Sequence, residues 1–264
     1  MPASRLFAAF LLSVLSALAF APAQKAPSSA PQTYEPTVGQ EGKDVVWVPT
    51  PQAVVDKMLD MAKVTSKDFV MDLGSGDGRT VITAAKRGAR AVGVEYNPDM
   101  VELSKRNAEK EGVAGKATFM KADLFETDFS QATVITMFLL PDINIKLRPK
   151  ILSLKPGTRI VSNSFTMGDW KADETAELNS SQGCNNSWCT ALLWIVPAKV
   201  GGTHKVPQGE LVLKQEFQML SGTLRTGGKT LALQGKVNGE EVVFKAGGKE
   251  YHGRMNGKQL ELHK

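Results

Sequence analysis

Histidine and cysteine are scarce in this chain of 264 residues, which contains three histidines and two cysteines. The histidines, His204, His252 and His263, all lie in the last quarter of the sequence, and this disfavours a histidine general base or a zinc site in the preceding part. Cys184 and Cys189 are separated by four residues, so they do not form the C-x-x-C motif of redox enzymes. We therefore expect no metal centre and no covalent catalysis.

Aromatic residues make up only 7% of the chain and are not interleaved with basic residues, so no nucleic-acid surface is expected. The formal net charge is +5, and nearly all of the excess lies after Val200. A basic tail of this kind either faces an anionic partner or serves as a solubilising surface. The one long apolar run, residues 6–20, is too short to span a bilayer comfortably.

The amino-terminal stretch has the pattern of a secretory signal. Arg5 precedes the apolar run 6–20, and the small residues at 21–23 follow it as a cleavage site. We predict a signal peptide over residues 1–23 and an exported protein, periplasmic or secreted, without a stable membrane span; an uncleaved anchor is the alternative. Residues 24–44 are rich in Pro, Ser and Gln and are predicted to be a flexible linker.

The most informative segment begins at residue 69. Residues 69–73 form a short apolar run typical of a buried strand, and three glycines then allow a sharp turn and a close approach of the backbone to a ligand. Residues 79–87 have helical spacing, and a helix whose first turn faces a ligand offers unpaired N–H groups to an anion. Residues 91–95 predict a second strand ending in Glu95, where an acid accepts ribose hydroxyls. The unit predicts an adenosine-like ligand.

The spacing of the glycines narrows the choice of ligand. Gly74, Gly76 and Gly78 form G-x-G-x-G rather than the G-x-G-x-x-G that seats the pyrophosphate of a dinucleotide. Asp72 precedes them at the end of the strand, where a carboxylate repels a pyrophosphate but pairs with an ammonium group. S-adenosyl-L-methionine carries such an ammonium group and is the predicted cofactor.

These residues resemble the first motif of the class I, seven-strand S-adenosylmethionine-dependent methyltransferases. The segment VPTPQ at residues 48–52, together with residues 72–79, is similar to the mitochondrial lysine methyltransferases of the ATP-synthase c-subunit type and, more distantly, to the non-SET histone lysine methyltransferases. The resemblance covers residues 45–199. It is closest to secreted bacterial members, in which the segments 139–141, 154–159 and 167–170 recur in the same order.

The resemblance implies a cofactor site made of residues from several strand ends. Asp123 matches the family position at which an acid meets the adenine amino group, although an aspartate after a strand is equally a turn residue. Tyr96 and Asn97 would flank the adenine and ribose, and Asn97-Pro98 is equally the start of a helix. The predicted cofactor contacts are Asp72, Gly74, Gly76, Gly78, Glu95, Tyr96, Asp123, Leu124 and Phe138.

Strands and helices alternate over residues 45–200, which we assign to one S-adenosylmethionine-binding methyltransferase domain. Helices are predicted over residues 51–62, 79–87, 99–111 and 143–154, and strands over 69–73, 91–95, 117–121, 132–140, 158–164 and 190–196. This alternation predicts an α/β fold with a doubly wound, Rossmann-like and mostly parallel sheet, and with ligands at the carboxyl ends of its strands.

Residues 206–264 have a different pattern. Short alternating segments at 211–218, 221–225, 230–237, 241–245, 249–254 and 259–262 are separated by the turn dipeptides Gly227-Gly228, Asn238-Gly239, Gly247-Gly248 and Asn256-Gly257. They predict a small C-terminal antiparallel β domain, a meander that packs on the larger domain. Its role is either a structural cap or a substrate-binding surface.

Methyl transfer from a sulfonium needs little acid–base assistance when the nucleophile is neutral and held in line, so an amine is a suitable acceptor. The resemblance implies a protein or peptide amine such as lysine. The acceptor would be contacted by the segments that follow the fourth and fifth predicted strands, residues 138–142 and 162–170. Asp142 and Asp169 are candidates for steering an ammonium group or accepting its proton, and both are equally helix-cap or turn residues.

Two other functions are compatible with these patterns. One is a nucleoside-binding module without turnover that carries the β domain as an interaction domain. The other is a nicotinamide-dependent oxidoreductase of related fold, which calorimetry with S-adenosylmethionine against NAD would separate. In an exported protein, Cys184 and Cys189 are expected to close a short loop as a disulfide.

Overall fold

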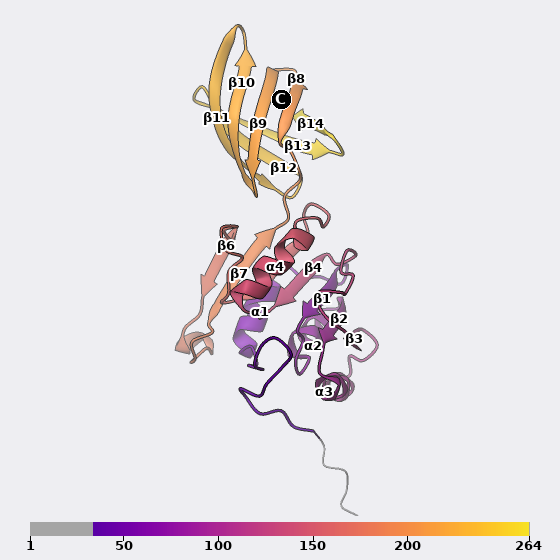
Figure 1. The fold of residues 1–264 in the computed structure, drawn as a ribbon. Coiled ribbons are helices and arrows are strands. Elements are labelled where there is room, and N and C mark those ends of the chain that lie inside the picture. Colours follow the sequence, from indigo (N-terminus) through magenta and orange to yellow (C-terminus); the bar gives the residue numbers. More distant parts are fainter. Residues whose placement is uncertain (1–33, 264) are drawn as a thin grey trace, which may run out of the picture. The chain divides into compact units, whose positions relative to one another are not determined.

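The computed structural model describes residues 34–263, and the predicted signal peptide lies outside the described residues. The described chain contains two seven-stranded sheets, one of them covered by helices and the other entirely antiparallel (Figure 1). In this part of the chain, no helix is both long and apolar enough to cross a bilayer.

The first sheet has the strand order β3-β2-β1-β4-β5-β7-β6. Its strands are β1 Phe69–Leu73, β2 Arg90–Glu95, β3 Ala117–Lys121, β4 Val134–Met137, β5 Arg159–Asn163, β6 Glu174–Glu177 and β7 Thr190–Ile195. The helices are α1 Gln52–Met61, α2 Arg79–Lys86, α3 Pro98–Lys110 and α4 Pro141–Ile151, and a short 3-10 helix, η1, spans Ser180–Gln182. Strands β1 to β5 pair in parallel, and β7 runs antiparallel to both of its neighbours.

Two apolar clusters pack on this sheet. Val70 and Met71 are neighbours in β1 and belong to different clusters, because successive side chains of a strand point to opposite faces. The first cluster also contains Val54, Val81 and Val101 of α1, α2 and α3, and the second contains Ile143 and Leu147 of α4. Helices therefore cover both faces, as a mostly parallel sheet requires, and the predicted doubly wound fold is confirmed.

The structure corrects the predicted strands in two places. The run 132–140 is not one strand, because β4 ends at Met137 and residues 138–140 leave the sheet. The apolar run continues past the end of the strand because residues 138–140 line a cavity there. The edge strand β6 was not predicted, because its burial pattern is almost entirely exposed and gives no apolar signal. In the described segment between β5 and β7 there is no α-helix, and β7 runs antiparallel to β5.

The second sheet follows the chain order from β8 to β14. Its strands are β8 Gly202–Val206, β9 Gly209–Glu216, β10 Met219–Thr226, β11 Lys229–Asn238, β12 Glu241–Ala246, β13 Lys249–Asn256 and β14 Gln259–Leu262. The sheet curls strongly (Figure 1), and its first and last strands contact each other, so it is nearly a closed barrel around an apolar interior that includes Leu211, Leu224 and Phe244. The predicted antiparallel meander is confirmed, with β8 as an additional strand.

Two of the predicted turns are displaced by one residue. Thr226 pairs with Lys229 and Ala246 with Lys249, so the two Gly-Gly dipeptides occupy two-residue hairpin turns as predicted. Asn238 pairs with Glu241, however, and Asn256 with Gln259, so both asparagines end their strands and each turn begins at the following glycine. Only glycine takes a positive φ in these two turns, so asparagine is not needed inside them.

The turn between β9 and β10 contacts the segment that follows β5. The Phe217 ring stacks on Trp170 with 6.1 Å between ring centroids, and the Gln218 side-chain amide donates a hydrogen bond of 2.8 Å to the Lys171 carbonyl. Phe217 has a positive φ of 51°, a conformation that non-glycine residues rarely adopt. These contacts are consistent with the predicted packing of the meander on the larger domain.

Candidate functional site

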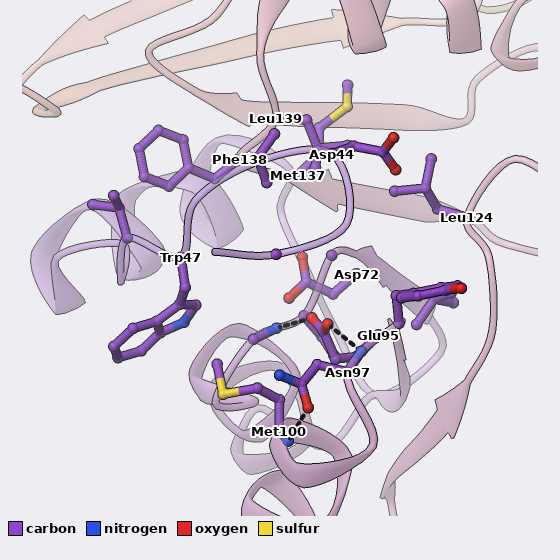
Figure 2. Close-up of a pocket in the computed structure, with 18 of the residues that line it drawn as sticks. Asp44, Trp47, Asp72, Glu95, Asn97, Met100, Leu124, Met137, Phe138 and Leu139 are labelled. Carbon is purple, nitrogen blue, oxygen red and sulfur yellow. Dashed lines mark hydrogen bonds between the residues drawn. The ribbon is translucent and has the colours of Figure 1, made fainter. Parts of the chain in front are cut away.

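A cavity lies at the carboxyl ends of β1, β2 and β4, and residues 40–50 form another part of its lining (Figure 2). The strands of a parallel sheet end together, so the residues that follow them converge on one region. Eight of the nine predicted cofactor contacts line this cavity, namely Asp72, Gly74, Gly76, Glu95, Tyr96, Asp123, Leu124 and Phe138. Gly78 does not.

The three glycines of the loop have positive φ values, 79° at Gly74, 52° at Gly76 and 82° at Gly78. A Cβ atom at Gly74 would lie 3.0 Å from the Leu139 side chain, which lines the cavity. Gly78 instead precedes α2, and a Cβ atom there would come within 2.8 Å of the Phe119 ring. Gly78 is therefore required for packing beneath the site, whereas Gly74 and Gly76 line the cavity, where the side chains of Leu139 and Trp47 lie close to the loop.

Glu95, at the end of β2, is oriented by two backbone N–H groups. Gly76 donates to its Oε2 and Asn97 to its Oε1, each at 2.9 Å (Figure 2). Each carboxylate oxygen retains a further lone pair, so the acid can accept two hydroxyl groups from a ligand. Asn97 itself caps α3, since its Oδ1 accepts from the Asp99 backbone at 2.9 Å and Pro98 occupies the first helical position.

Asp72, at the end of β1, is a buried acid with 5% of its surface exposed. Burial raises the pKa of this carboxyl to about 7, and the negative charges of Glu95 and Asp77 act in the same direction, whereas a hydrogen bond from Thr136 opposes them. The Thr136 hydroxyl donates this bond at 2.6 Å. Within residues 34–263 no basic side chain pairs with Asp72, so a cationic ligand group would stabilise its charged form.

Asp123, after β3, forms an ion pair with Lys43 and accepts a hydrogen bond of 2.9 Å from the Phe125 backbone. The Lys43 hydrogen bond is the main reason that the pKa of this carboxyl is lowered. The Lys43 ammonium also lies 4.8 Å from the centre of the Tyr96 ring. Asp123 is therefore a charged acceptor at the cavity, and Lys43 is its present partner.

Residues 40–50 belong to the site although the composition of residues 24–44 predicts a linker. The Gly39 N–H donates to the Trp47 carbonyl at 2.8 Å and the Trp47 N–H donates to the Gln40 carbonyl at 2.9 Å, so the segment folds back on itself. The Trp47 indole lies beside the glycine loop, and a Cβ atom at Gly76 would come within 2.7 Å of its Nε1. The available signal was the apolar run at 45–49, because a solvated linker has little need of such residues.

The remaining lining is largely apolar and follows β4 and β5. Figure 2 shows Phe138 and Leu139 on one side of the cavity and Glu95 and Asn97 on the other. Phe165, from the segment after β5, and Trp188, from the loop before β7, complete this apolar part. The predicted acceptor segments thus contribute Phe138 and Phe165, whereas Trp188 was not predicted.

Neither candidate base lies in the cavity lining. Asp142 is exposed in the first turn of α4, where its charge favours the helix N-terminus. Asp169 is exposed and forms an ion pair with Arg148, and this contact is the main reason that its pKa is lowered. Both residues therefore have structural roles, as in the alternative interpretation of the sequence.

The two cysteines lie at disulfide distance, with 5.8 Å between their Cα atoms, as predicted. They close a loop that contains Trp188. The structure therefore connects the cysteines to the cavity through this side chain, a relation that the sequence spacing does not reveal.

Comparison with known proteins identifies similar chains. The model of the ANTKMT methyltransferase domain family matches residues 72–174, a range that contains all nine predicted cofactor contacts. A protein-lysine N-methyltransferase of Saccharolobus islandicus is 44% identical over 164 residues, which cover 61% of this chain and 96% of that protein. The human lysine N-methyltransferase of the ATP synthase c-subunit is 34% identical over 143 residues, but the match spans only 59% of its length.

A solved structure is also similar to this chain. The RNA methyltransferase from Salinibacter ruber, in complex with S-adenosyl-L-homocysteine, has 46% sequence identity and a TM-score of 0.53. The match covers 58% of this chain and 96% of that chain. The α/β part of this chain therefore has relatives along almost their full lengths.

Proposed function

Because this chain belongs to the S-adenosylmethionine-dependent methyltransferase family with the ANTKMT domain, we propose that its acceptor is the side-chain amine of lysine in a protein. The observation that carries the proposal is the 44% identity to the Saccharolobus islandicus protein-lysine N-methyltransferase over 96% of that protein. The acid-lined and aromatic-lined cavity supports it, because the two parts suit a charged cofactor and a largely aliphatic acceptor side chain.

The residues present fit the cofactor. Asp72 is a buried acid without a basic partner among the described residues, and it would pair with the ammonium group of S-adenosylmethionine. Glu95 is oriented to accept the ribose hydroxyls, and Asp123 would accept from the adenine amino group in place of Lys43. Gly74 and Gly76 allow the backbone to approach. When bound, the cofactor supplies a methyl group activated by the positive sulfonium.

The chain's contribution to the reaction is to hold a neutral amine in line. Neither Asp142 nor Asp169 lies in the lining, so neither is placed to accept the proton of the acceptor amine there. Phe138, Leu139 and Phe165 provide apolar surfaces against which the aliphatic stem of the lysine would pack. Positioning of the nucleophile then supplies the acceleration.

A radiolabel assay tests the acceptor class. The full chain is incubated with S-adenosylmethionine labelled in its methyl group and with protein and RNA fractions from its native host. We expect protease-sensitive label that is recovered as methylated lysine after acid hydrolysis. Glu95→Ala should give strongly reduced label when the cofactor concentration is below the wild-type Kd. Ribonuclease-sensitive label would overturn the proposal and favour the acceptor class of the Salinibacter ruber relative.

We also propose that the chain is exported. The proposal is supported by Arg5 followed by the apolar run 6–20 and small residues, and by the cysteine pair, since disulfides persist in oxidising compartments. Identification of the mature amino terminus tests it.

A further inference from the structure

Three aromatic rings meet in the apolar part of the cavity lining. The centroids of Phe138 and Phe165 are 5.7 Å apart with the rings nearly parallel, and the Trp188 ring lies 5.7 Å from the first and 5.1 Å from the second. All three side chains are partly exposed, so they present ring surface to the cavity rather than only to one another. We call this set the aromatic cluster.

Phe165 is held by an unusual backbone. Ser164 precedes it with a positive φ of 59°, a conformation that is unfavourable for serine and persists only where the surroundings fix it. The Phe165 carbonyl accepts hydrogen bonds from the Ser162 hydroxyl at 2.8 Å and from the Asn144 side-chain amide at 3.3 Å. Strand β5 and helix α4 therefore both hold the backbone that carries this ring.

Trp188 is held in a different way. It is the residue before Cys189, within the loop that the cysteine pair closes, and its N–H donates to the Asn186 side chain at 2.8 Å. The Leu178 N–H donates to the Cys189 carbonyl at 2.8 Å and joins the end of this loop to the segment after β6. Trp188 and both cysteines lie outside residues 72–174, the part that matches the family model. This arrangement therefore lies outside the range that the family model matches.

We propose that the aromatic cluster is the acceptor subsite, which takes the alkyl chain and the methylated ammonium group of lysine, and that the Cys184–Cys189 pair positions Trp188 in it. This inference rests on the proposed lysine acceptor. It deepens that proposal by naming the residues that select the acceptor.

The chemistry of the rings favours this role. Faces of Trp and Phe attract an ammonium group, and aromatic enclosures are the usual site for quaternary ammonium ions. The same surfaces cover the aliphatic stem of lysine without requiring any hydrogen bond. Leu140 also lines the cavity and is 45% exposed, so apolar surface continues to the outside along the path that a long side chain would follow.

The test uses tetramethylammonium as the probe and the full chain saturated with S-adenosylhomocysteine. The four tryptophans are labelled with 5-fluorotryptophan, and the Trp188 fluorine signal is assigned by its loss in Trp188→Ala. We expect tetramethylammonium to shift the Trp188 signal saturably, and tert-butanol, a neutral molecule of similar shape, to shift it much less. Absence of a saturable shift would overturn the proposal.

Variants separate positioning from general stability. Trp188→Ala should weaken tetramethylammonium binding by about threefold or more, and Trp188→Phe should restore most of that binding. Cys184→Ser with Cys189→Ser should weaken the probe similarly, while calorimetric affinity for S-adenosylhomocysteine changes less than about twofold, since the cofactor acids lie on other elements. Equal probe binding in Trp188→Ala, or equal losses of probe and cofactor, would contradict the assignment.

The same samples keep the two proposals apart. If tetramethylammonium binds as expected but the label assay yields no methylated lysine, the acceptor class is wrong while the cation subsite remains. The other outcome is that lysine is methylated while Trp188→Ala keeps its probe binding and its KM for the protein acceptor. In that case the assignment of the subsite is wrong while the proposed function remains.

Discussion

Replacement of Asp72 by asparagine should change the stability of the cofactor-free protein and its cofactor affinity in opposite directions. The asparagine carbonyl can still accept the 2.6 Å hydrogen bond from Thr136, so the substitution removes a charge with little change in packing. The pKa of Asp72 is about 7 instead of the ordinary value of 3.8. At 1.36 kcal/mol per unit, this difference disfavours the ionised folded state by up to about 4 kcal/mol.

The sign of the pH dependence follows from this shift. As the pH rises, Asp72 loses its proton in the unfolded chain first, so its contribution to folding stability falls between about pH 4 and pH 7 and is lowest above that range. The Asp72→Asn variant has no titrating group at this position, so its folding stability does not fall for this reason. The stability of the variant relative to wild type should therefore increase by about 2 to 3 kcal/mol between pH 5 and pH 8. Urea denaturation of both cofactor-free proteins at the two pH values measures it.

Cofactor affinity should change in the other direction. The variant lacks the charged partner of the ammonium group, so its affinity for S-adenosylmethionine should be at least about tenfold weaker at pH 8. The wild-type Kd should rise up to about tenfold per pH unit below pH 7, because protonated Asp72 cannot pair with a cation, and the variant should lack this dependence. Calorimetry with Asp142→Asn, an exposed acid outside the lining, is the control. Unchanged affinity, or a variant less stable than wild type at pH 8, would refute the reasoning.

Three further outcomes are expected. Glu95→Ala removes two charge-assisted hydrogen bonds to the ribose and should weaken S-adenosylmethionine at least about tenfold by calorimetry, with an unchanged melting temperature as the sign of an intact fold. Gly76→Val places a branched side chain on a backbone with φ of 52°, so affinity should collapse while circular dichroism still shows the sheet; loss of both would indicate a purely structural turn. Mass spectrometry of protein from its native host should find an amino terminus near Gln24 and a Cys184–Cys189 disulfide. Reduction of this disulfide should lower the free energy of unfolding by about 2 kcal/mol and the melting temperature by several degrees. An intact initiator methionine with both thiols free would exclude export.

The sequence predicts the α/β core well because its signals are local. The apolar run in β1, the glycines after it and the acid at the end of β2 each reflect a requirement of nearby backbone, and the structure brings their side chains into one cavity. The edge strand β6 and the early end of β4 were not predictable in the same way. An exposed strand carries no apolar pattern, and an apolar run does not show where the chain leaves a sheet.

The turns of the β meander show the same limit. Glycine marks where a positive φ is possible, and it therefore indicates each hairpin from sequence alone. Whether the preceding Asn238 belongs to the strand or to the turn depends on pairing with Glu241 across the hairpin, and that pairing is decided by register.

The sequence by itself determined the fold class and the nucleoside-type loop, since the strand, the glycine turn and the terminal acid are consecutive features of one stretch of chain. Only the tertiary structure decided what surrounds them. Lys43 reaches Asp123, Trp47 covers Gly76, and Trp188 joins Phe138 across distances that no local pattern encodes. The physical reason is that close packing brings together side chains from distant segments, and their contacts, burial and pKa values exist only once the chain has folded.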